Sequence, residues 1–91
     1  PKIEFKQESV KIAPGDAFDI SSNISRVYDE IDGELVYADT LTEGTYVVSG
    51  NVNRFVPGSY SVQIQAMDNN GMISESSYGV TVTSYMKIHF T

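Results

Sequence analysis

Apolar and polar residues alternate with a period of two along much of this chain, and helical periodicity is hard to find. The longest alternation follows Pro57 and Gly58. Its apolar positions are Tyr60, Val62, Ile64 and Ala66, and the polar residues between them are Ser59, Ser61, Gln63 and Gln65. Because successive side chains of a strand point to opposite faces, one set faces a core and the other faces water. The pattern therefore predicts a half-buried β-strand.

A second alternating segment follows the run Asp68, Asn69, Asn70, Gly71. Its apolar positions are Tyr78, Val80 and Val82, and its other positions are Ser77, Gly79, Thr81 and Thr83. Asn and Gly tolerate the positive φ angles of tight turns. The two segments are therefore predicted to form an antiparallel hairpin.

Short candidate strands occupy most of the remaining chain. They cover residues 2–5, 9–12, 26–28, 35–37 and 46–52, and a Pro-Gly-Asp turn at 14–16 leads into residues 17–20. The one candidate for a helical turn is residues 21–25. About seven short strands at roughly regular spacing are typical of an all-β sandwich.

Tyr60 has the sequence context of a tyrosine corner, which is a tyrosine near the start of a strand and two residues before a core position, here Val62. Pro57 and Gly58 form the turn before it. In this interpretation the hydroxyl donates to backbone a few residues upstream while the ring packs inward. An ordinary core tyrosine is the alternative.

Length and charge narrow the classes of function. The 91 residues make one domain, which we place at residues 1–84, with 85–91 as a tail or the start of a following repeat. Twelve acidic and six scattered basic residues give a net charge of −6, which excludes a nucleic-acid-binding surface. With no cysteine and no apolar run near the ~20 residues of a membrane span, neither disulfides nor membrane insertion is expected.

Four short motifs, in order along the chain, resemble the bacterial immunoglobulin-like repeats of Gram-positive cell-surface proteins. They are Asp29, Asp32 and Gly33; Gly50 and Val52; Pro57, Gly58 and Tyr60; and Asp68 and Gly71. The match covers about residues 2–84, which is nearly the whole chain. The chain departs from the pattern at residues 38–44, which look like a loop extension.

This resemblance implies an immunoglobulin-like antiparallel β-sandwich that is extracellular, attached to the cell wall or secreted, and flanked by neighbouring repeats in tandem. Such repeats mostly act as structural spacers or adhesive modules, so neither enzymatic activity nor a cofactor is expected. Two alternatives stay open. One is a domain that binds a glycan or host protein with the loops at one end of the sandwich; the other is an accessory domain of a secreted hydrolase.

Asp29, Asp32 and Asp68 are the candidates for a metal site, because carboxylates are ligands of Ca²⁺, which takes about six to eight oxygens. The segment after Asp68 is not an EF-hand loop, since Gly71 stands at its fourth position rather than its sixth. Asp and Asn also belong in turns, where they hydrogen-bond nearby backbone. Turn chemistry is therefore favoured, and a weak Ca²⁺ site is the alternative.

No catalytic residue is assigned. The single histidine, His89, stands two residues from the end of the chain, where a frayed terminus would not hold it between catalytic partners. Tyr37, Tyr46 and Phe55 are the candidates for an exposed, ligand-facing aromatic platform. Packing of these rings against one another at the end of the sandwich is the alternative.

Residues 87–90, Lys-Ile-His-Phe, repeat the pattern of residues 2–5, Lys-Ile-Glu-Phe. The spacing is about one immunoglobulin-like module, so residues 87–90 are predicted to begin the next repeat. A tail that packs its apolar side on this domain is an equal alternative.

Overall fold

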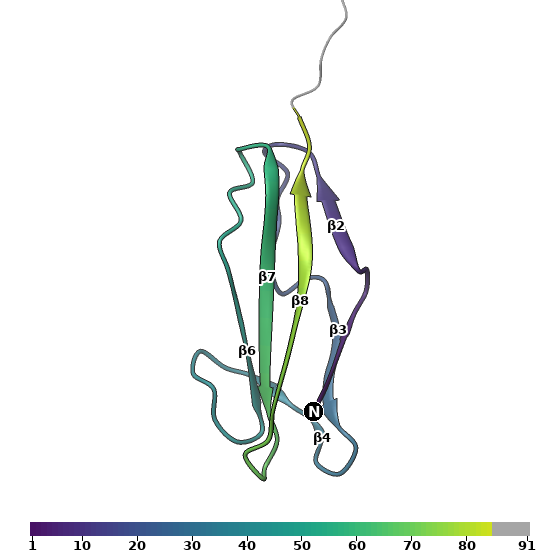
Figure 1. The fold of residues 1–91 in the computed structure, drawn as a ribbon, viewed down its shortest axis with the longest axis vertical. Helices are drawn as coiled ribbons and strands as arrows, with labels where there is room; N and C mark the ends of the chain where they lie inside the picture. The colour runs from purple at the N-terminus through teal and green to yellow at the C-terminus, as the bar shows by residue number, and fades with distance from the viewer. Residues whose placement is uncertain (85–91) are drawn as a thin grey trace, which may run out of the picture.

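The computed structural model describes residues 1–84, which form an all-β domain of two sheets (Figure 1). The strands are β1 (Lys2–Phe5), β2 (Ser9–Ile12), β3 (Ile24–Asp29), β4 (Gly33–Glu34), β5 (Val36–Tyr37), β6 (Thr45–Gly50), β7 (Gly58–Met67) and β8 (Ile73–Val82). One sheet has the order β1-β3-β4 and the other β2-β8-β7-β6-β5. The predicted all-β class is confirmed, and two sheets are consistent with a β-sandwich. The predictions for residues 85–91, including His89, lie outside the described residues.

Two pairs of neighbouring strands are parallel, which the purely antiparallel sandwich of the resemblance did not include. β2 pairs with β8 in parallel, and β5 pairs with β6 in parallel. The reason for the first pair is that β1 and β2 follow one another without a reversal of direction. The chain moves from one sheet to the other over residues 6–8, and β2 then runs alongside the last strand.

The hairpin of β7 and β8 forms as the alternation predicts. Val62 pairs with Tyr78 and Tyr60 with Val80, in an antiparallel ladder that continues to Met67 and Ile73. Of the apolar inward positions Tyr60 is half-buried and the others are buried, whereas Gln63, Gln65, Ser77 and Thr81 are exposed. Gly71 supplies the positive φ angle of the turn, at 83°.

The core lies between the two sheets and has two parts. Val62, Ile64, Tyr78 and Val80 form the larger one, with β1, β2 and the segment before β3 packed against it. The smaller one joins Val27, Leu35 and Ala66. Leu35 stands where the chain changes sheet: its N–H donates to the carbonyl of Val27, and the next residue pairs with β6. Of the predicted strand at 35–37, residues 36–37 form β5 and Leu35 makes the crossing between the sheets.

The segment before β3 differs from the prediction. Residues 17–20 form no strand and residues 21–23 form turns rather than a helical turn. Asp19 is the reason, because its side-chain Oδ1 accepts from the N–H of Ser21 at 2.8 Å and its carbonyl accepts from the N–H of Ser22. Such local bonds compete with a sheet ladder. Phe18 and Ile20 still pack on the core.

Asn23 fixes the connection between β1 and β2. Its side chain is 5% exposed, and its Oδ1 accepts from the N–H of Gln7 at 3.0 Å while its Nδ2 donates to the carbonyl of Gln7 at 2.9 Å. Its own carbonyl accepts from the N–H of Lys6. The point at which the chain leaves the smaller sheet is therefore held by three hydrogen bonds to one buried residue.

The described chain enters and leaves at opposite ends of the long axis (Figure 1). Pro1 lies beside the turn of the β7–β8 hairpin, where its carbonyl accepts from the hydroxyl of Ser74 at 2.7 Å. Ser84 follows the far end of β8, where the N–H of Thr83 donates to the carbonyl of Ile12. The length of β8 thus separates the two ends.

Candidate functional site

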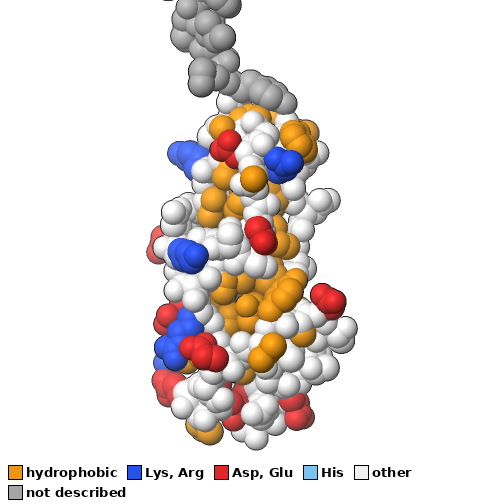
Figure 2. All heavy atoms as spheres, turned by 180° about the vertical axis from the view of Figure 1, so that it is seen from behind, with side chains coloured by type: hydrophobic (Ala, Val, Ile, Leu, Met, Phe, Trp, Pro, Cys, Tyr) orange, Lys and Arg blue, Asp and Glu red, His pale blue; other side chains and the backbone are white. Residues whose placement is uncertain are grey.

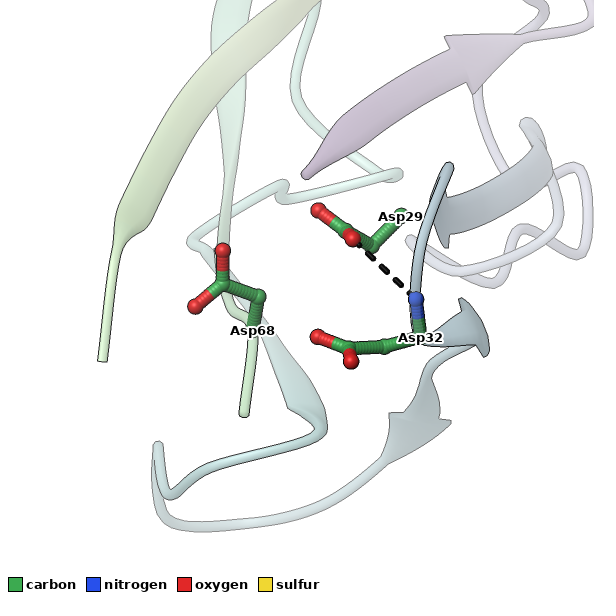
Figure 3. A group of neighbouring side chains, drawn as sticks. All are labelled: Asp29, Asp32 and Asp68. Atoms are coloured by element: carbon green, nitrogen blue, oxygen red, sulfur yellow. Dashed lines mark hydrogen bonds between the residues drawn. The ribbon is translucent and has the colours of Figure 1, made fainter. Parts of the chain in front are cut away.

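Three aspartates from both sheets converge at the end of the molecule that carries Pro1 (Figure 3). Asp29 ends β3, Asp32 lies in the β3–β4 turn, and Asp68 follows β7. One carboxylate oxygen from each lies within 4.8 Å of the others. The structure therefore brings together the three residues that the sequence singles out for a metal, and it places them at turns.

The Asp29 carboxylate shapes the β3–β4 turn. Its Oδ2 accepts from the N–H of Ile31 at 2.9 Å and from the N–H of Asp32 at 3.2 Å. These backbone donors, the Ile31 amide first, favour the charged form and hold the pKa of Asp29 below its ordinary value. The amino group of Pro1 lies 3.4 Å from the other oxygen, Oδ1.

Asp68 plays the same part in the β7–β8 turn. It is only 7% exposed, and its Oδ1 accepts from the N–H of Asn70 at 2.8 Å and from the N–H of Met72 at 2.9 Å. Its own N–H donates to the carbonyl of Met72. The buried carboxylate thus has backbone partners, as a buried charge requires.

Asp32 joins the two turns. Its Oδ2 accepts from the N–H of Asn69 at 3.0 Å, so a side chain of the smaller sheet holds the hairpin turn of the larger one. A hard cation would need oxygens beyond these three carboxylates to complete its shell. If the cluster only pins turns, the melting temperature should be equal in Ca²⁺ and in EDTA; a bound ion would raise it.

Acidic side chains gather around this end of the molecule (Figure 2). Besides Asp29, which faces the amino group of Pro1, two of them have basic side-chain partners: Lys2 Nζ lies 2.6 Å from Glu30 Oε1, and Arg26 Nε lies 2.5 Å from Glu34 Oε1. The first pair raises the pKa of Lys2 and lowers that of Glu30, through a hydrogen bond and opposite charge. Both pairs are exposed, so their contribution to stability is small.

The three candidate aromatic residues do not form one platform. The rings of Tyr37 and Tyr46 lie 5.7 Å apart, toward the end of the molecule that carries the three aspartates, where Tyr46 pairs with Ala66. Phe55 precedes β7 at the opposite end, with the Arg54 guanidinium 4.3 Å from its ring. Neither a shared ligand platform nor packing of all three rings is present, because the ten residues of β7 separate Phe55 from the other two.

Tyr60 makes the bond that a tyrosine corner requires. Its hydroxyl donates to the carbonyl of Val56 at 2.7 Å, across the turn formed by Pro57 and Gly58. Its half-buried ring packs against the larger core. Gly50, a glycine of the second motif, lets β6 approach β7 closely. A Cβ at this position would lie 2.9 Å from the carbonyl oxygen of Ser61.

Sequence reasoning missed two residues that hold the fold together. Asn23 lies within the candidate helical turn at residues 21–25, and nothing near it in the sequence points to Gln7. Tyr78 was identified as a core residue, but its hydroxyl also donates to the carbonyl of Ile20. The parity of β8 indicates that this ring is buried, and a buried tyrosine hydroxyl needs a partner, so the need for such a bond could have been inferred.

Two features of residues 1–84 bear on other classes of site. No pocket is found among these residues. Across the same range there is no helix of the length and apolarity that crossing a membrane requires.

A scan of protein-family models found no match to the chain, and a search of curated proteins found none either.

Proposed function

We propose that this chain is a non-catalytic structural module of a bacterial cell-surface or secreted protein, and that it acts as a spacer in series with neighbouring immunoglobulin-like repeats. One observation carries the proposal: the described chain enters beside the hairpin turn and leaves at the far end of β8 (Figure 1). A domain with this path adds its own length to the distance between whatever precedes and follows it.

The assignment to the immunoglobulin-like class rests on three features together. The first strand is divided between the sheets as β1 and β2, the longest strands form the β7–β8 hairpin, and Tyr60 bonds the backbone before β7. The last feature is typical of immunoglobulin-like sandwiches. The net charge of −6 would keep such modules soluble and apart from anionic neighbours.

The proposal is tested by exchange within the protein that carries this domain. Replacing residues 1–84 with an unrelated β-sandwich of equal end-to-end length should preserve the protein's function, whereas deleting them should shorten its maximum dimension in solution scattering. Loss of function on a length-matched exchange would contradict a spacer, because a spacer contributes only length and stiffness.

A second assay addresses binding directly. Tyr37, which is 51% exposed, lies beside Tyr46 and is the candidate for a surface of two rings, whereas Phe55, 55% exposed, lies at the opposite end of the domain. We expect no specific signal from the 91-residue chain on a glycan array. Binding that is lost in Tyr37→Ala and kept in Phe55→Ala would favour the glycan-binding alternative over the spacer.

A further inference from the structure

We propose that the open edge of β6 is a docking surface for a second copy of this chain, whose own β6 pairs with it antiparallel and continues the larger sheet. The proposal goes beyond a spacer, because it gives the module a partner of its own kind. It rests on the edge of the sheet, whereas the spacer proposal rests on the path of the chain.

The edge of β6 that faces away from β7 is only partly covered. β5 pairs with Thr45 and Tyr46 alone, and the chain bends away at residues 39–40. Within residues 1–84 no strand lies beside residues 47–50 on this side, which forms a border of the larger sheet (Figure 1). Most of β6 is therefore an edge strand.

The open edge presents backbone groups that a strand can bind. The carbonyl of Tyr46 accepts from the N–H of Ala38, so it points away from β7. Because backbone groups alternate in direction along a strand, the N–H and C=O groups of Val48 and Gly50 point to the same side. An added strand would pair with these groups, as in other cases of strand addition to a sheet edge.

The sequence of β6 lacks the features that keep edge strands from pairing. Charged residues, proline and short length protect such edges. β1 carries Lys2 and Glu4, β2 carries Lys11 and is followed by Pro14, and β4 and β5 have two residues each. Residues 44–53 contain neither a charge nor a proline, and they include three valines, a threonine and a tyrosine. Such residues favour strand pairing.

The charges on either side of β6 select the partner. Asp39 and Glu43 precede the strand and are exposed, and Arg54 follows it, where its Nη1 donates to the carbonyl of Gly15 at 2.7 Å. Across residues 1–84 none of the three forms a salt bridge. In an antiparallel pair of identical strands, the start of each strand lies beside the end of the other. The acidic side of each copy then faces Arg54 of the other, whereas a parallel pair would bring like charges together.

The free backbone groups define the register. Val48 pairs with Gly50 of the second copy and Gly50 with its Val48, so the two-fold axis passes through Ser49, and each such pair exchanges two hydrogen bonds. Val48 is half-buried against the larger core, and the added strand would cover part of its remaining surface. The ladder ends where β5 begins in each copy, so the association is weak and reversible. The two modules run in opposite directions, which suits chains carried by two facing surfaces.

Exchange of charges tests this arrangement. In Glu43→Lys two positive charges face each other across the dimer, and in Arg54→Glu two negative charges do. We expect the dissociation constant of each variant alone, measured by sedimentation equilibrium of the 91-residue chain, to rise about tenfold. An equimolar mixture of the two variants should recover the wild-type affinity, because opposite charges face each other again in the mixed dimer. Glu8→Lys, before β2 at the opposite border, makes the same change in net charge and should not weaken association.

Amide exchange of the wild-type chain tests the backbone contact. The N–H groups of Val48 and Gly50 should exchange quickly at low protein concentration and become protected at high concentration. By alternation the N–H of Val47 points to β7, so it should be protected at both concentrations. Protection of Val48 and Gly50 that does not depend on concentration would place a segment of the same chain on the edge and would overturn the proposal.

A wild-type chain that stays monomeric up to about 1 mM rejects the pairing and leaves the edge to a different partner, with the spacer proposal intact. A mixture of the charge variants that associates no better than either alone also rejects it. If Arg54→Glu does not fold, the comparison of Glu43→Lys with Glu8→Lys and the amide exchange still decide. Loss of function on the length-matched exchange, with function kept by Glu43→Lys in the whole protein, would reject the spacer and leave the pairing intact.

Discussion

The β7–β8 hairpin and the N-terminal segment from β1 to the turns before β3 are held in place by different kinds of interaction. The hairpin pairs ten residues with ten in one regular ladder and turns every second side chain toward the core, where six of them are buried: Val62, Ile64, Ala66, Tyr78, Val80 and Val82. The N-terminal segment has two strands of four residues in different sheets, and single polar groups hold its connections. Apolar burial stabilises the hairpin, whereas satisfied polar contacts place the N-terminal segment.

The comparison has a thermodynamic consequence. A buried apolar side chain contributes through the surface that it removes from water, so its loss is costly wherever the core cannot collapse. A buried polar group contributes little by itself, but removing it leaves its partners unpaired. The two regions should therefore respond most strongly to different kinds of substitution.

The largest effect is expected in the hairpin. Ile64 is 0% exposed at the centre of the core, and Ile64→Ala should cost about 2–5 kcal/mol in the free energy of unfolding, through lost burial and a cavity. Denaturant titration measures this change. Gln63→Ala, one position along on the exposed face, should stay within about 0.5 kcal/mol. Similar losses at both positions would mean that the alternation does not define the core.

In the N-terminal segment, Asn23→Ala removes both side-chain bonds to Gln7 at a buried site. We expect a loss of about 2 kcal/mol, since two backbone groups lose their partner. Asn70→Ala, in the exposed hairpin turn, is the matched control and should change little. If the two asparagine variants unfold at the same denaturant midpoint, the connection between β1 and β2 does not depend on Asn23.

A substitution at Tyr60, near the start of β7, should have a smaller effect on the free energy of unfolding. Tyr60→Phe removes the hydroxyl that bonds the carbonyl of Val56 and keeps the ring, so a loss of about 1 kcal/mol is expected. Tyr37→Phe changes the same group on a side chain that is 51% exposed and should be neutral. An unchanged midpoint for Tyr60→Phe would indicate that Tyr60 acts only by packing.

The smallest effect concerns pH and the β3–β4 turn. The folded-state pKa of Asp29 lies below its ordinary value of 3.8, chiefly because backbone N–H groups bind the carboxylate. This contribution to stability is therefore present above that value and is lost as pH falls through the lower folded-state pKa. The urea midpoint of the wild type should fall more steeply with acidification than that of Asp29→Asn. Parallel curves would show that Asp29 does not contribute to acid sensitivity.

The alternation of apolar and polar residues and the turn residues predicted the part of the fold that depends on neighbouring residues, which is the β7–β8 hairpin. The parity of Tyr60 to Ala66 and the turn at Gly71 suffice to define the hairpin. Asp29, Asp32 and Asp68 stand out in the sequence because carboxylates are ligands of Ca²⁺ and also belong in turns, but their convergence depends on how the two sheets pack. The parallel β2–β8 pair, the crossing at Leu35 and the separation of Phe55 from Tyr46 arise from pairings between distant segments, which periodicity does not encode.

The central claim is that the domain holds its two ends apart as one rigid body. Spin labels on Pro1→Cys and Ser84→Cys measure this most directly, with Ala13→Cys and Ser84→Cys as the comparison. The first pair should give one narrow distribution centred at about 30 Å or more, set by the ten residues of β8 at about 3.3 Å each. The second pair should give a much shorter distance. A broad distribution for the first pair, or one as short as that of the second, would contradict the account.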